Sequence, residues 1–346
     1  MKPRDNMSDI RTKQGVGLVL SGGGGKGAYE VGVWKALDEF GVTPNIEAIA
    51  GTSVGGLNSA LLAQGDLDLA LDVWSTISPQ AVMTLNELPA YRKFSGAVAD
   101  LLTGTRFFGF AQSVHQWIAK RYADQGVLSK DGLSRLIDGA IDLKQLLAFS
   151  GPVYIAAYNI STCRLCYFNL KSCISVEELK ERLLASASIP VVFGKTYIDG
   201  ELYWDGGLPV VGDNTPVKPL YEDGFRNLIV VHLTREEPVD RKVFPDCNII
   251  EIMPQEDLGG MVSGTMNFKP ESAKANIQRG YNDAIRILEP LFKTGLALNR
   301  IQHAFYEISQ EQTLFSEQNQ LLDQKIRRSG EEIDSLIETL NKGGST

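Results

Sequence analysis

The chain has 346 residues, which is enough for one large domain or two modest ones around a substantial buried core. Apolar residues make up 43% of the chain and charged residues 22%, as in an ordinary globular protein. With 34 Lys and Arg against 42 Asp and Glu, the formal net charge is -8, which argues against binding to nucleic-acid polymers, because that requires a basic surface. Net acidity does not exclude contact with a membrane through local apolar loops.

No segment reaches the roughly 18 consecutive apolar residues of a membrane-spanning helix. Residues 1–14 are polar and lack the apolar stretch of a secretory signal, so we expect a flexible leader and a cytoplasmic protein. The cysteines suit a reducing compartment. Cys163 and Cys166 have CxxC spacing but no second pair and no nearby histidine, which favours cysteines on a pair of strands over a zinc site, and we predict no metal.

The first part of the chain repeats one local pattern. Residues 16–20 predict a buried strand, which leads through a glycine-rich stretch into a helix over residues 28–40. A second apolar strand at 46–50 leads through another glycine turn into a helix over 57–63. Strand, glycine turn and helix in this order indicate a parallel α/β sheet, in which functional sites lie at the carboxyl ends of the strands.

The later segments complete the expected catalytic domain, residues 15–293. The expected elements are a helix over 66–77, an irregular segment over 85–130, strands over 152–160 and 165–170, a helix over 175–186, a hairpin of 195–198 with 202–204, strands over 227–233 and 248–253, and a helix over 270–293. Ser175, followed three residues later by Glu178, is typical of a capping box at a helix start.

Residues 294–346 are rich in Gln, Glu, Lys and Leu and predict a helical tail with a break near Ser329-Gly330. Apolar side chains recur along one face of this tail at Ile301, Phe305, Ile308, Phe315, Leu322, Ile326, Ile333 and Ile337. The stripe fits a helix packed on its own core, or alternatively a homodimer or another docked partner, and its spacing is too irregular to predict a coiled coil.

Ser53 is the candidate nucleophile, because it lies in the pentapeptide Gly51-Thr-Ser-Val-Gly55 between a predicted strand and a predicted helix. An abrupt turn from strand to helix places a serine in a strained backbone with its hydroxyl exposed, and the flanking glycines leave room for neighbouring segments. The pentapeptide alone is a weak signal. The buried strand before it and the helix after it make it informative.

The glycine-rich loop over residues 22–27 has three possible roles. It matches the Gly-x-Gly-x-x-Gly pattern of a dinucleotide site, for which Glu47 lies about where a ribose-binding acid is expected. A Walker A loop is excluded, since Gly27 follows Lys26 where Ser or Thr is required. The third role is an oxyanion hole, in which consecutive backbone N–H groups stabilise a tetrahedral intermediate. A nucleophile at the end of the next strand favours this third role.

A serine nucleophile needs a base, and the sequence offers histidines and one well-placed aspartate. His115, His232 and His303 have no supporting motif, and His232 reads as an ordinary strand histidine, so a Ser-His-Asp triad is not well supported. Asp205 begins the turn Asp-Gly206-Gly207 directly after a strand. A structural Asp-Gly turn is the plain alternative, but burial would raise the proton affinity of this carboxylate enough to make a working dyad.

Taken together, the motifs resemble those of the patatin-like phospholipases. The resemblance is carried by four segments in order, namely Ser21-Gly-Gly-Gly-Gly-Lys-Gly27, Gly51-Thr-Ser-Val-Gly55, Ala185-Ser-Ala-Ser-Ile-Pro-Val-Val-Phe193 and Asp205-Gly-Gly207. It covers about residues 15–290. The departures are small, because family members often have Ala at Gly25 and sometimes Arg at Lys26.

The resemblance implies a three-layer α/β/α sandwich with a mostly parallel central sheet, followed here by a helical extension. It also implies hydrolysis of fatty-acyl esters of membrane phospholipids by a Ser53-Asp205 dyad, without metal or cofactor. By the same resemblance, the backbone of Gly23, Gly24 and Gly25 forms the oxyanion hole, Lys26 holds the basic position of the family, and Gly22, Gly27, Gly51, Gly55, Gly206 and Gly207 shape the motifs. Lys26 would then face anionic head groups, or alternatively pair with a neighbouring acid.

Two further expectations concern partners. Phe107, Phe108 and Phe110 lie within 85–130, a possible lid or cap, and either contact lipid or pack on the core. Some bacterial relatives resemble anti-phage effectors that a cyclic dinucleotide activates, so we expect action at the inner membrane surface with such an activator as a possible partner. The rival functions are a nucleotide-binding oxidoreductase and a catalytically idle scaffold.

Overall fold

The structure is a computed structural model, and it describes residues 13–82, 84–85, 128–190, 192–235 and 238–343. The expected lid segment, including Phe107, Phe108 and Phe110, therefore lies almost entirely outside the described residues. The chain divides into two compact units, Met1–Ile287 and Leu288–Thr346. The first unit contains the sheet and all the motifs above.

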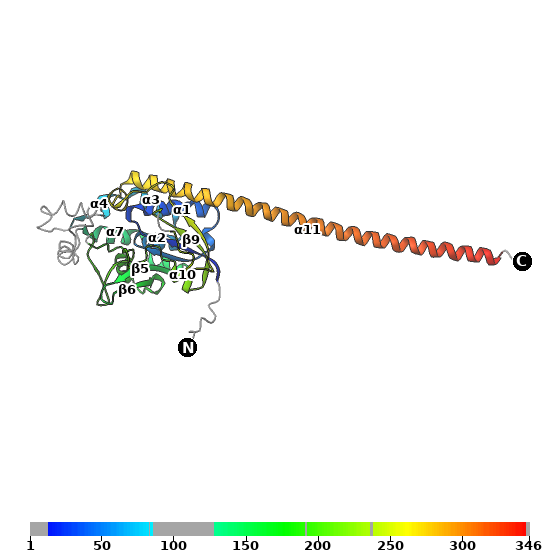
Figure 1. Ribbon diagram of the computed structural model, residues 1–346, viewed down its shortest axis with the longest axis horizontal. Coiled ribbons are helices and arrows are strands. Elements are labelled where there is room, and N and C mark those ends of the chain that lie inside the picture. Colours follow the sequence, from blue (N-terminus) through cyan, green and yellow to red (C-terminus); the bar gives the residue numbers. More distant parts are fainter. Residues whose placement is uncertain (1–12, 83, 86–127, 191, 236–237, 344–346) are drawn as a thin grey trace, which may run out of the picture. The chain divides into compact units, whose positions relative to one another are not determined.

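The first unit is built on one mixed sheet of eight strands (Figure 1). Its strands are β1 (Lys13–Leu20), β2 (Ile46–Thr52), β5 (Val153–Asn159), β6 (Arg164–Asn169), β7 (Thr196–Ile198), β8 (Glu201–Asp205), β9 (Phe225–Val231) and β10 (Asn248–Ile252). Their order is β10-β9-β1-β2-β5-β8-β7, with β6 paired to β5. The five strands from β10 to β5 are parallel, whereas β6 and β8 pair antiparallel with β5, and β7 pairs antiparallel with β8.

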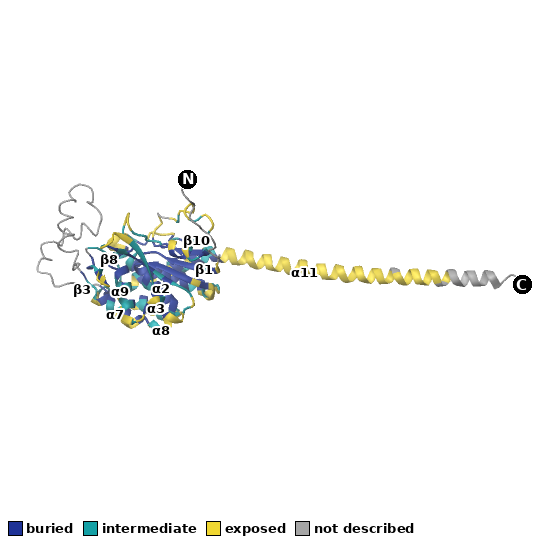
Figure 2. Cartoon of the chain, turned by 90° about the horizontal axis from the view of Figure 1, so that it is seen from below, coloured by how far each residue is buried: buried dark blue, intermediate teal, exposed yellow. Residues whose placement is uncertain are grey.

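The parallel strands are apolar because helices cover both faces of the sheet. β1 and β2 are buried over most of their length (Figure 2), as expected for parallel strands sandwiched between helices. The antiparallel β6 alternates less clearly and is mostly half-buried. The expected α/β sandwich with a largely parallel sheet and a C-terminal helical extension is therefore confirmed.

The helices connect these strands in chain order. They are α1 (Ala28–Glu39), α2 (Val54–Gln64), α3 (Leu67–Thr76), α4 (Pro79–Val82), α7 (Asp131–Ala140), α8 (Leu143–Ala148), α9 (Val176–Ser186), α10 (Lys218–Glu222) and α11 (Pro270–Gly343), with short 3-10 turns η1 (Gly24–Gly27), η2 (Thr43–Asn45) and η3 (Leu170–Ser172) and a π-turn η4 (Met261–Thr265). α10 covers the face of the sheet that carries Val19. α2 and α9 pack on the opposite face, where Gly56 of α2 lies against Ile155. The sheet is therefore the middle of three layers.

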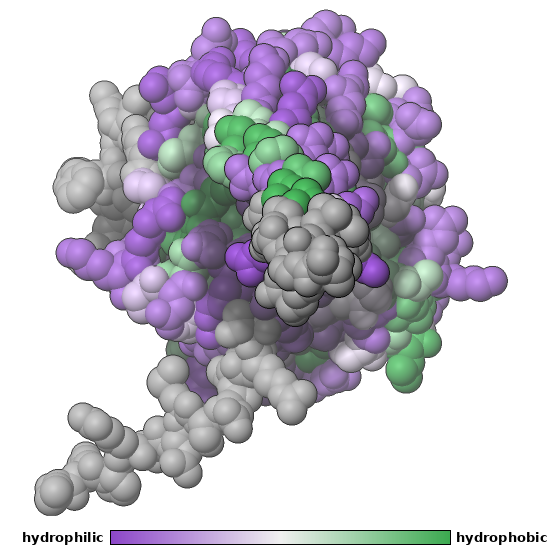
Figure 3. All heavy atoms as spheres, turned by 90° about the vertical axis from the view of Figure 1, so that its right-hand side faces the viewer, coloured by the Kyte–Doolittle hydropathy of each residue, from purple (hydrophilic) through white to green (hydrophobic). Residues whose placement is uncertain are grey.

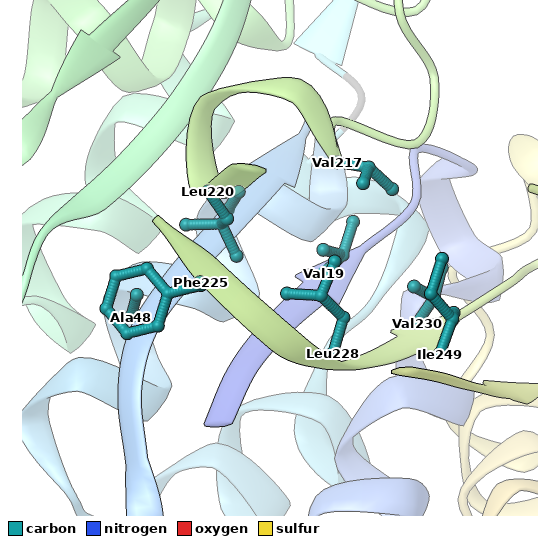
Figure 4. Packing of buried hydrophobic residues seen from close by; sticks show 9 residues of the cluster. Val19, Ala48, Val217, Leu220, Phe225, Leu228, Val230 and Ile249 are labelled. Atoms are coloured by element: carbon teal, nitrogen blue, oxygen red, sulfur yellow. The ribbon is translucent and has the colours of Figure 1, made fainter. Parts of the chain in front are cut away.

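One apolar cluster shows how α10 closes its face of the sheet (Figure 4). Leu220 of α10, fully buried, packs with Val19 of β1, Ala48 of β2 and Leu228 of β9. Three neighbouring parallel strands thus share a single helix as their cover. This packing fixes the relative positions of β1 and β2, and both strands end at the glycine motifs.

The start of α9 follows the expected capping pattern with one difference. The Ser175 hydroxyl accepts a hydrogen bond from the Glu178 N–H at 3.1 Å, as in a capping box. The Glu178 carboxylate, however, accepts from the N–H of Ile174 at 2.8 Å rather than from that of Ser175. The N–H groups of Ile174 and Glu178 at this end of the helix thus both have hydrogen-bond acceptors.

Three expectations about element boundaries are wrong. Lys13 and Gln14 belong to β1 rather than to a loose leader, since Lys13 pairs with Phe225 of β9. The segment 85–130 is not wholly irregular at its ends, because β3 (Thr84–Leu85) pairs with β4 (Leu128–Ser129). The break near Ser329-Gly330 is absent, and α11 runs through it as one helix of 74 residues. A single glycine lowers helix propensity by about 1 kcal/mol, which a long helix tolerates.

The first part of α11 belongs to the first unit and packs against α1. Gly32 of α1 lies against the backbone of Ile277, and Gly280 lies against the backbone of Tyr29, so glycines let these two helices approach closely. No helix among the described residues is long and apolar enough to cross a membrane.

The cluster under α10 generates a stability prediction. Replacing the fully buried Leu220 by alanine removes apolar contacts and leaves a cavity, so Leu220→Ala should lower the free energy of unfolding by about 2 to 5 kcal/mol in urea denaturation. The control is Val243→Ala, at a side chain that is 59% exposed, which should change stability by about 0.5 kcal/mol or less. Equal effects of the two substitutions would contradict this packing.

Candidate active site

Ser53 lies at the sharp turn between β2 and α2, in a backbone conformation that serine rarely adopts. Its φ of 56° and ψ of -122° place it outside the ordinary helical and extended regions. The turn is possible because Gly51 and Gly55 approach other backbones closely: a Cβ on Gly55 would lie 2.4 Å from the Leu20 carbonyl oxygen. The strained elbow expected from the pentapeptide is therefore present.

A second serine supports this strained turn. The N–H of Ser53 donates to the hydroxyl oxygen of Ser186 at 2.9 Å, and Ser186 is fully buried at the end of α9. This side chain, from a segment 133 residues further along the chain, ties the elbow to the helix that covers β5. Sequence reasoning missed this role for Ser186, although the segment 185–193 had been recognised as part of the resemblance.

The glycine loop follows β1 and lies beside the elbow. Gly24 has a φ of 58°, which favours glycine, and a Cβ on it would lie 2.2 Å from the Thr265 carbonyl oxygen of η4. Among the described residues, the amides of Gly23, Gly24 and Gly25 donate no hydrogen bond to another segment, whereas the Lys26 N–H donates to the Gly23 carbonyl at 3.3 Å. Three backbone donors at the end of β1 are thus left for another acceptor.

The Lys26 side chain is buried beside the same loop, with 7% of its surface exposed. Burial lowers the pKa of its ammonium group, and the negative charge of Asp257 opposes that effect. The Lys26 side chain also lines the cavity described below, so it presents a cation to whatever occupies that cavity.

Asp205 ends β8, and the antiparallel pairing of β8 with β5 carries it to the elbow. Its N–H donates to the Ser188 carbonyl at 2.9 Å, and its Oδ1 accepts from the Gly207 N–H at 2.7 Å. Its Oδ2 is buried and has no hydrogen-bond partner within 3.5 Å among the described residues. This carboxylate is therefore held by one oxygen and left free at the other.

The burial of Asp205 changes its acidity. Burial raises the pKa of this carboxyl group to about 6, while the Ser53 hydroxyl and the Gly207 N–H hold it down. The Ser53 hydroxyl thus lies close enough to the carboxylate to lower its pKa. Such contacts often tighten only when substrate is bound.

Asn214 joins the glycine loop to the Asp-Gly-Gly turn. Its carbonyl accepts from the Gly22 N–H at 3.0 Å, and its side-chain amide donates to the Gly22 carbonyl at 3.3 Å. A Cβ on Gly22 or Gly207 would lie within 2.6 Å of the Asn214 Oδ1, so a larger residue at either position would displace the Asn214 side chain. The sequence gives no local signal for Asn214.

Two cavities of different character meet at Ser53. The first has a volume of about 450 Å³ and mixed walls, with Lys26, Asp205, Asn214 and Thr234 on the polar part and Leu208, Val210 and Met261 on the apolar part. The second is a narrow slot of about 60 Å³ between apolar side chains of α2, α3, α7 and the segment after α9, among them Leu57, Leu61, Val73, Trp74, Leu133 and Phe193. Gly24, Ser53, Ile189 and Thr265 line both cavities. A molecule with a polar end and an acyl chain would thus have its junction at Ser53.

The rival sites are not assembled. Glu47 lies near the start of β2, against Gly15. The glycine loop lies at the other end of the strands, so Glu47 cannot reach a ribose bound there. His232 pairs with Glu251 at 2.9 Å, and His303 lies on α11 with Glu307 at 3.4 Å. Neither histidine lines the two cavities at Ser53, and His115 lies outside the described residues. No group of His, Cys, Asp and Glu suited to a metal ion occurs in the part of the chain that the structure describes.

Comparison with known proteins assigns the family. Residues 18–221 match the family model described as patatin-like phospholipase, which is well over half of the chain. The chain belongs to the patatin-like phospholipase family. This membership supports a lipid hydrolase activity, and the matched range contains Ser53, Asp205 and the glycine loop.

Curated relatives match parts of the chain. Lysophospholipase NTE1 of Cryptococcus neoformans var. neoformans serotype D is 26% identical over 218 residues, which are 63% of this chain and 11% of the relative. Patatin-like phospholipase domain-containing protein 7 of Rattus norvegicus is 33% identical over 107 residues, 28% of this chain and 8% of the relative. The chain thus spans at most 11% of the length of these relatives.

Solved structures show a more distant likeness. VipD from Legionella pneumophila gives a TM-score of 0.47 at 15% identity, covering 80% of this chain and 67% of that chain. Human GIVD cytosolic phospholipase A2 gives 0.40 at 10% identity, covering 82% and 58%. The family assignment rests on the sequence match and not on these likenesses.

The raised pKa of Asp205 predicts a pH-dependent stability difference. The unfolded carboxyl group ionises more readily than the folded one, so the wild type loses stability as the pH rises from about 4 through 6. Asp205→Asn removes this loss. The unfolding free energy of the variant minus that of the wild type should increase by roughly 1 to 2 kcal/mol between pH 5 and pH 8. Urea denaturation at both pH values measures it.

The matched control is Asp68→Asn, at an exposed position in the first turn of α3. Its stability relative to the wild type should not change in this way between the two pH values. A difference for Asp205→Asn that is flat or shrinks with pH would contradict a carboxylate made basic by burial.

Proposed function

We propose that the chain is a phospholipase that hydrolyses fatty-acyl esters of membrane phospholipids with Ser53 as nucleophile and Asp205 as base. The observation that carries the proposal is the meeting of a larger, partly polar cavity and an apolar slot at Ser53. In this proposal the acyl chain occupies the apolar slot, and the ester with its head group occupies the larger cavity. The junction then lies beside the candidate nucleophile.

In the first half of the reaction, the Ser53 oxygen attacks the ester carbonyl carbon while its proton passes to the Asp205 carboxylate. With a pKa of about 6, this carboxylate is mostly ionised at neutral pH and is a stronger base than an ordinary aspartate. The negative charge on the former carbonyl oxygen is stabilised by the amides of Gly23, Gly24 and Gly25. Collapse of the intermediate expels the alcohol portion, which takes the proton from Asp205 and leaves an acyl-enzyme on Ser53.

In the second half, Asp205 accepts a proton from water as the water oxygen attacks the acyl-enzyme carbonyl. Collapse of this second intermediate breaks the bond to Ser53, whose oxygen recovers the proton, and a fatty acid is released. No step requires a metal or a cofactor. The cation of Lys26 at the wall of the larger cavity supports an anionic head group there, and we propose that reading over its pairing with Asp257.

The site of action follows from the substrate. A bilayer is the source of such esters, so we propose that the chain works at a membrane surface from the cytoplasmic side. Activation by a cyclic dinucleotide in anti-phage defence, inferred from the resemblance alone, remains a prediction, since no described residue has been tied to such a ligand.

The test is hydrolysis of liposomes with the lipid products identified. Ser53→Ala and Asp205→Asn should each lower the rate by a factor of ~10³ or more, because each removes one half of a unit that works together. Ser309→Ala and Asp68→Asn, at exposed positions, should retain the wild-type rate. Circular dichroism and unfolding curves establish that all four variants are folded.

Full activity in either site variant would refute the dyad, and the absence of any fatty-acid release would refute the lipid ester as substrate. The same assay is run with and without cyclic dinucleotides. A rate that no cyclic dinucleotide changes removes the predicted activation and leaves the dyad untouched.

A further inference from the structure

The second unit exposes a long apolar face that the proposed reaction does not use. From Glu289 onward, α11 is exposed along the described part (Figure 2), and its large apolar side chains are 38 to 70% accessible. The surface view from the end of α11 shows green apolar side chains next to purple polar ones on this helix (Figure 3). Because α11 continues through Ser329 and Gly330, the spacing of these side chains can be followed over one unbroken helix.

The apolar side chains follow a seven-residue repeat. Leu298, Phe305, Ile326 and Ile333 fall on the first core position of the repeat, called a. Ile301, Ile308, Phe315 and Leu322 fall on the second core position, called d. Each of these eight side chains is at least half exposed. The alternating spacing of three and four residues is that of a left-handed coiled coil over residues 298–333.

Three core positions of this repeat carry polar side chains, and they define the arrangement of the strands. Gln312 and Asn319 occupy a positions, and Ser329 occupies a d position. In a parallel dimer in register, each residue faces its own copy, so Gln312, Asn319 and Ser329 each face a polar partner. In an antiparallel dimer, a positions face d positions, and Ser329 is the one polar d residue between 298 and 333. Gln312 and Asn319 cannot both face it, so one polar group would be buried against an apolar side chain.

The charged residues beside the core positions a and d, which flank the seam between the two helices, are compatible with the parallel arrangement. In the described part, the charged flanking residues Glu311 and Lys325 would meet Ser316 and Gly330 across a parallel seam, so no like charges are opposed there. Between 298 and 333 the helix carries four Lys and Arg against six Asp and Glu. A helix that lies on an anionic membrane surface is instead rich in Lys and Arg, so a second protein helix fits this face better than a lipid surface does.

We propose that residues 298–333 of α11 form a parallel, in-register, two-stranded coiled coil with a second copy of this chain. The proposal is independent of the proposed phospholipase reaction, because it uses none of the residues at Ser53. In this coiled coil, the polar side chains of Asn319 and Gln312 select the parallel register.

The first test measures the mass of the full chain by analytical ultracentrifugation at micromolar concentration. The wild type should have twice the 37.9 kDa mass of one chain. Ile326→Asp places two carboxylates face to face inside the seam and should raise the dissociation constant at least ~100-fold, giving a monomer. Gln324→Asp makes the same charge on the outer face two residues away and should remain dimeric.

A wild type that is monomeric throughout, or a trimer, overturns the proposal, as does dissociation by Gln324→Asp to the same extent as by Ile326→Asp. A monomer that binds anionic vesicles, with binding lost in Ile326→Asp, would assign the face to a lipid surface and overturn the proposal too. Phospholipid hydrolysis is not part of the readout, so the result stands whether or not the chain is a phospholipase.

The second test fixes the orientation. Leu298→Cys, in a Cys163→Ser background that removes the exposed native thiol, should form an intermolecular disulfide under mild oxidation, because identical a positions are neighbours only in a parallel register. The Cys163→Ser parent without the new cysteine is the control. A dimer in which Leu298→Cys does not cross-link beyond the parent contradicts the parallel arrangement. Asn319→Ile should keep or tighten the association while relaxing its register.

Discussion

The candidate site depends on the burial of one carboxylate beside one serine. Asp205 is held by a single backbone donor at Oδ1, and its other oxygen lies buried without a hydrogen bond among the described residues. A buried, partly unsatisfied carboxylate is costly to ionise, and this cost raises its pKa to about 6. The same cost that weakens the fold would make Asp205 the base that a serine requires, since neither His232 nor His303 lines the two cavities at Ser53.

Much of the surrounding structure keeps these two side chains in place. The strained Ser53 is held from α9 by Ser186, and Asp205 is held by the Ser188 carbonyl two residues later. One short segment at the end of α9 thus supports both members of the proposed dyad. The sheet also contributes, because the pairing changes from parallel to antiparallel at β5. The antiparallel β8 therefore ends beside the carboxyl ends of the parallel strands β1 and β2.

The sequence predicted the parts of this arrangement that depend on local pattern. Apolar strands followed by glycines located β1, β2 and their turns, and the Asp-Gly-Gly turn after a hairpin located Asp205. The contacts made by Ser186, Ser188 and Asn214 join segments far apart in the chain, and nothing in the local spacing indicates them. The order of strands and the switch to antiparallel pairing at β5 likewise follow from packing of the whole sheet. The helical break expected at Ser329-Gly330 is wrong for the opposite reason. The low helix propensity of one glycine was given more weight than the continuity of a long helix.

The central claim is that the buried Asp205 activates Ser53. The most direct measurement is the rate at which a fluorophosphonate labels the protein at a series of pH values, with the modified residue located by peptide mass spectrometry. The account predicts labelling on Ser53, with a rate that rises as the pH passes through about 6 and then levels, and a much slower rate without this rise in Asp205→Asn. Labelling at another residue, or labelling of Ser53 at the same rate and with the same pH profile in Asp205→Asn, would contradict it.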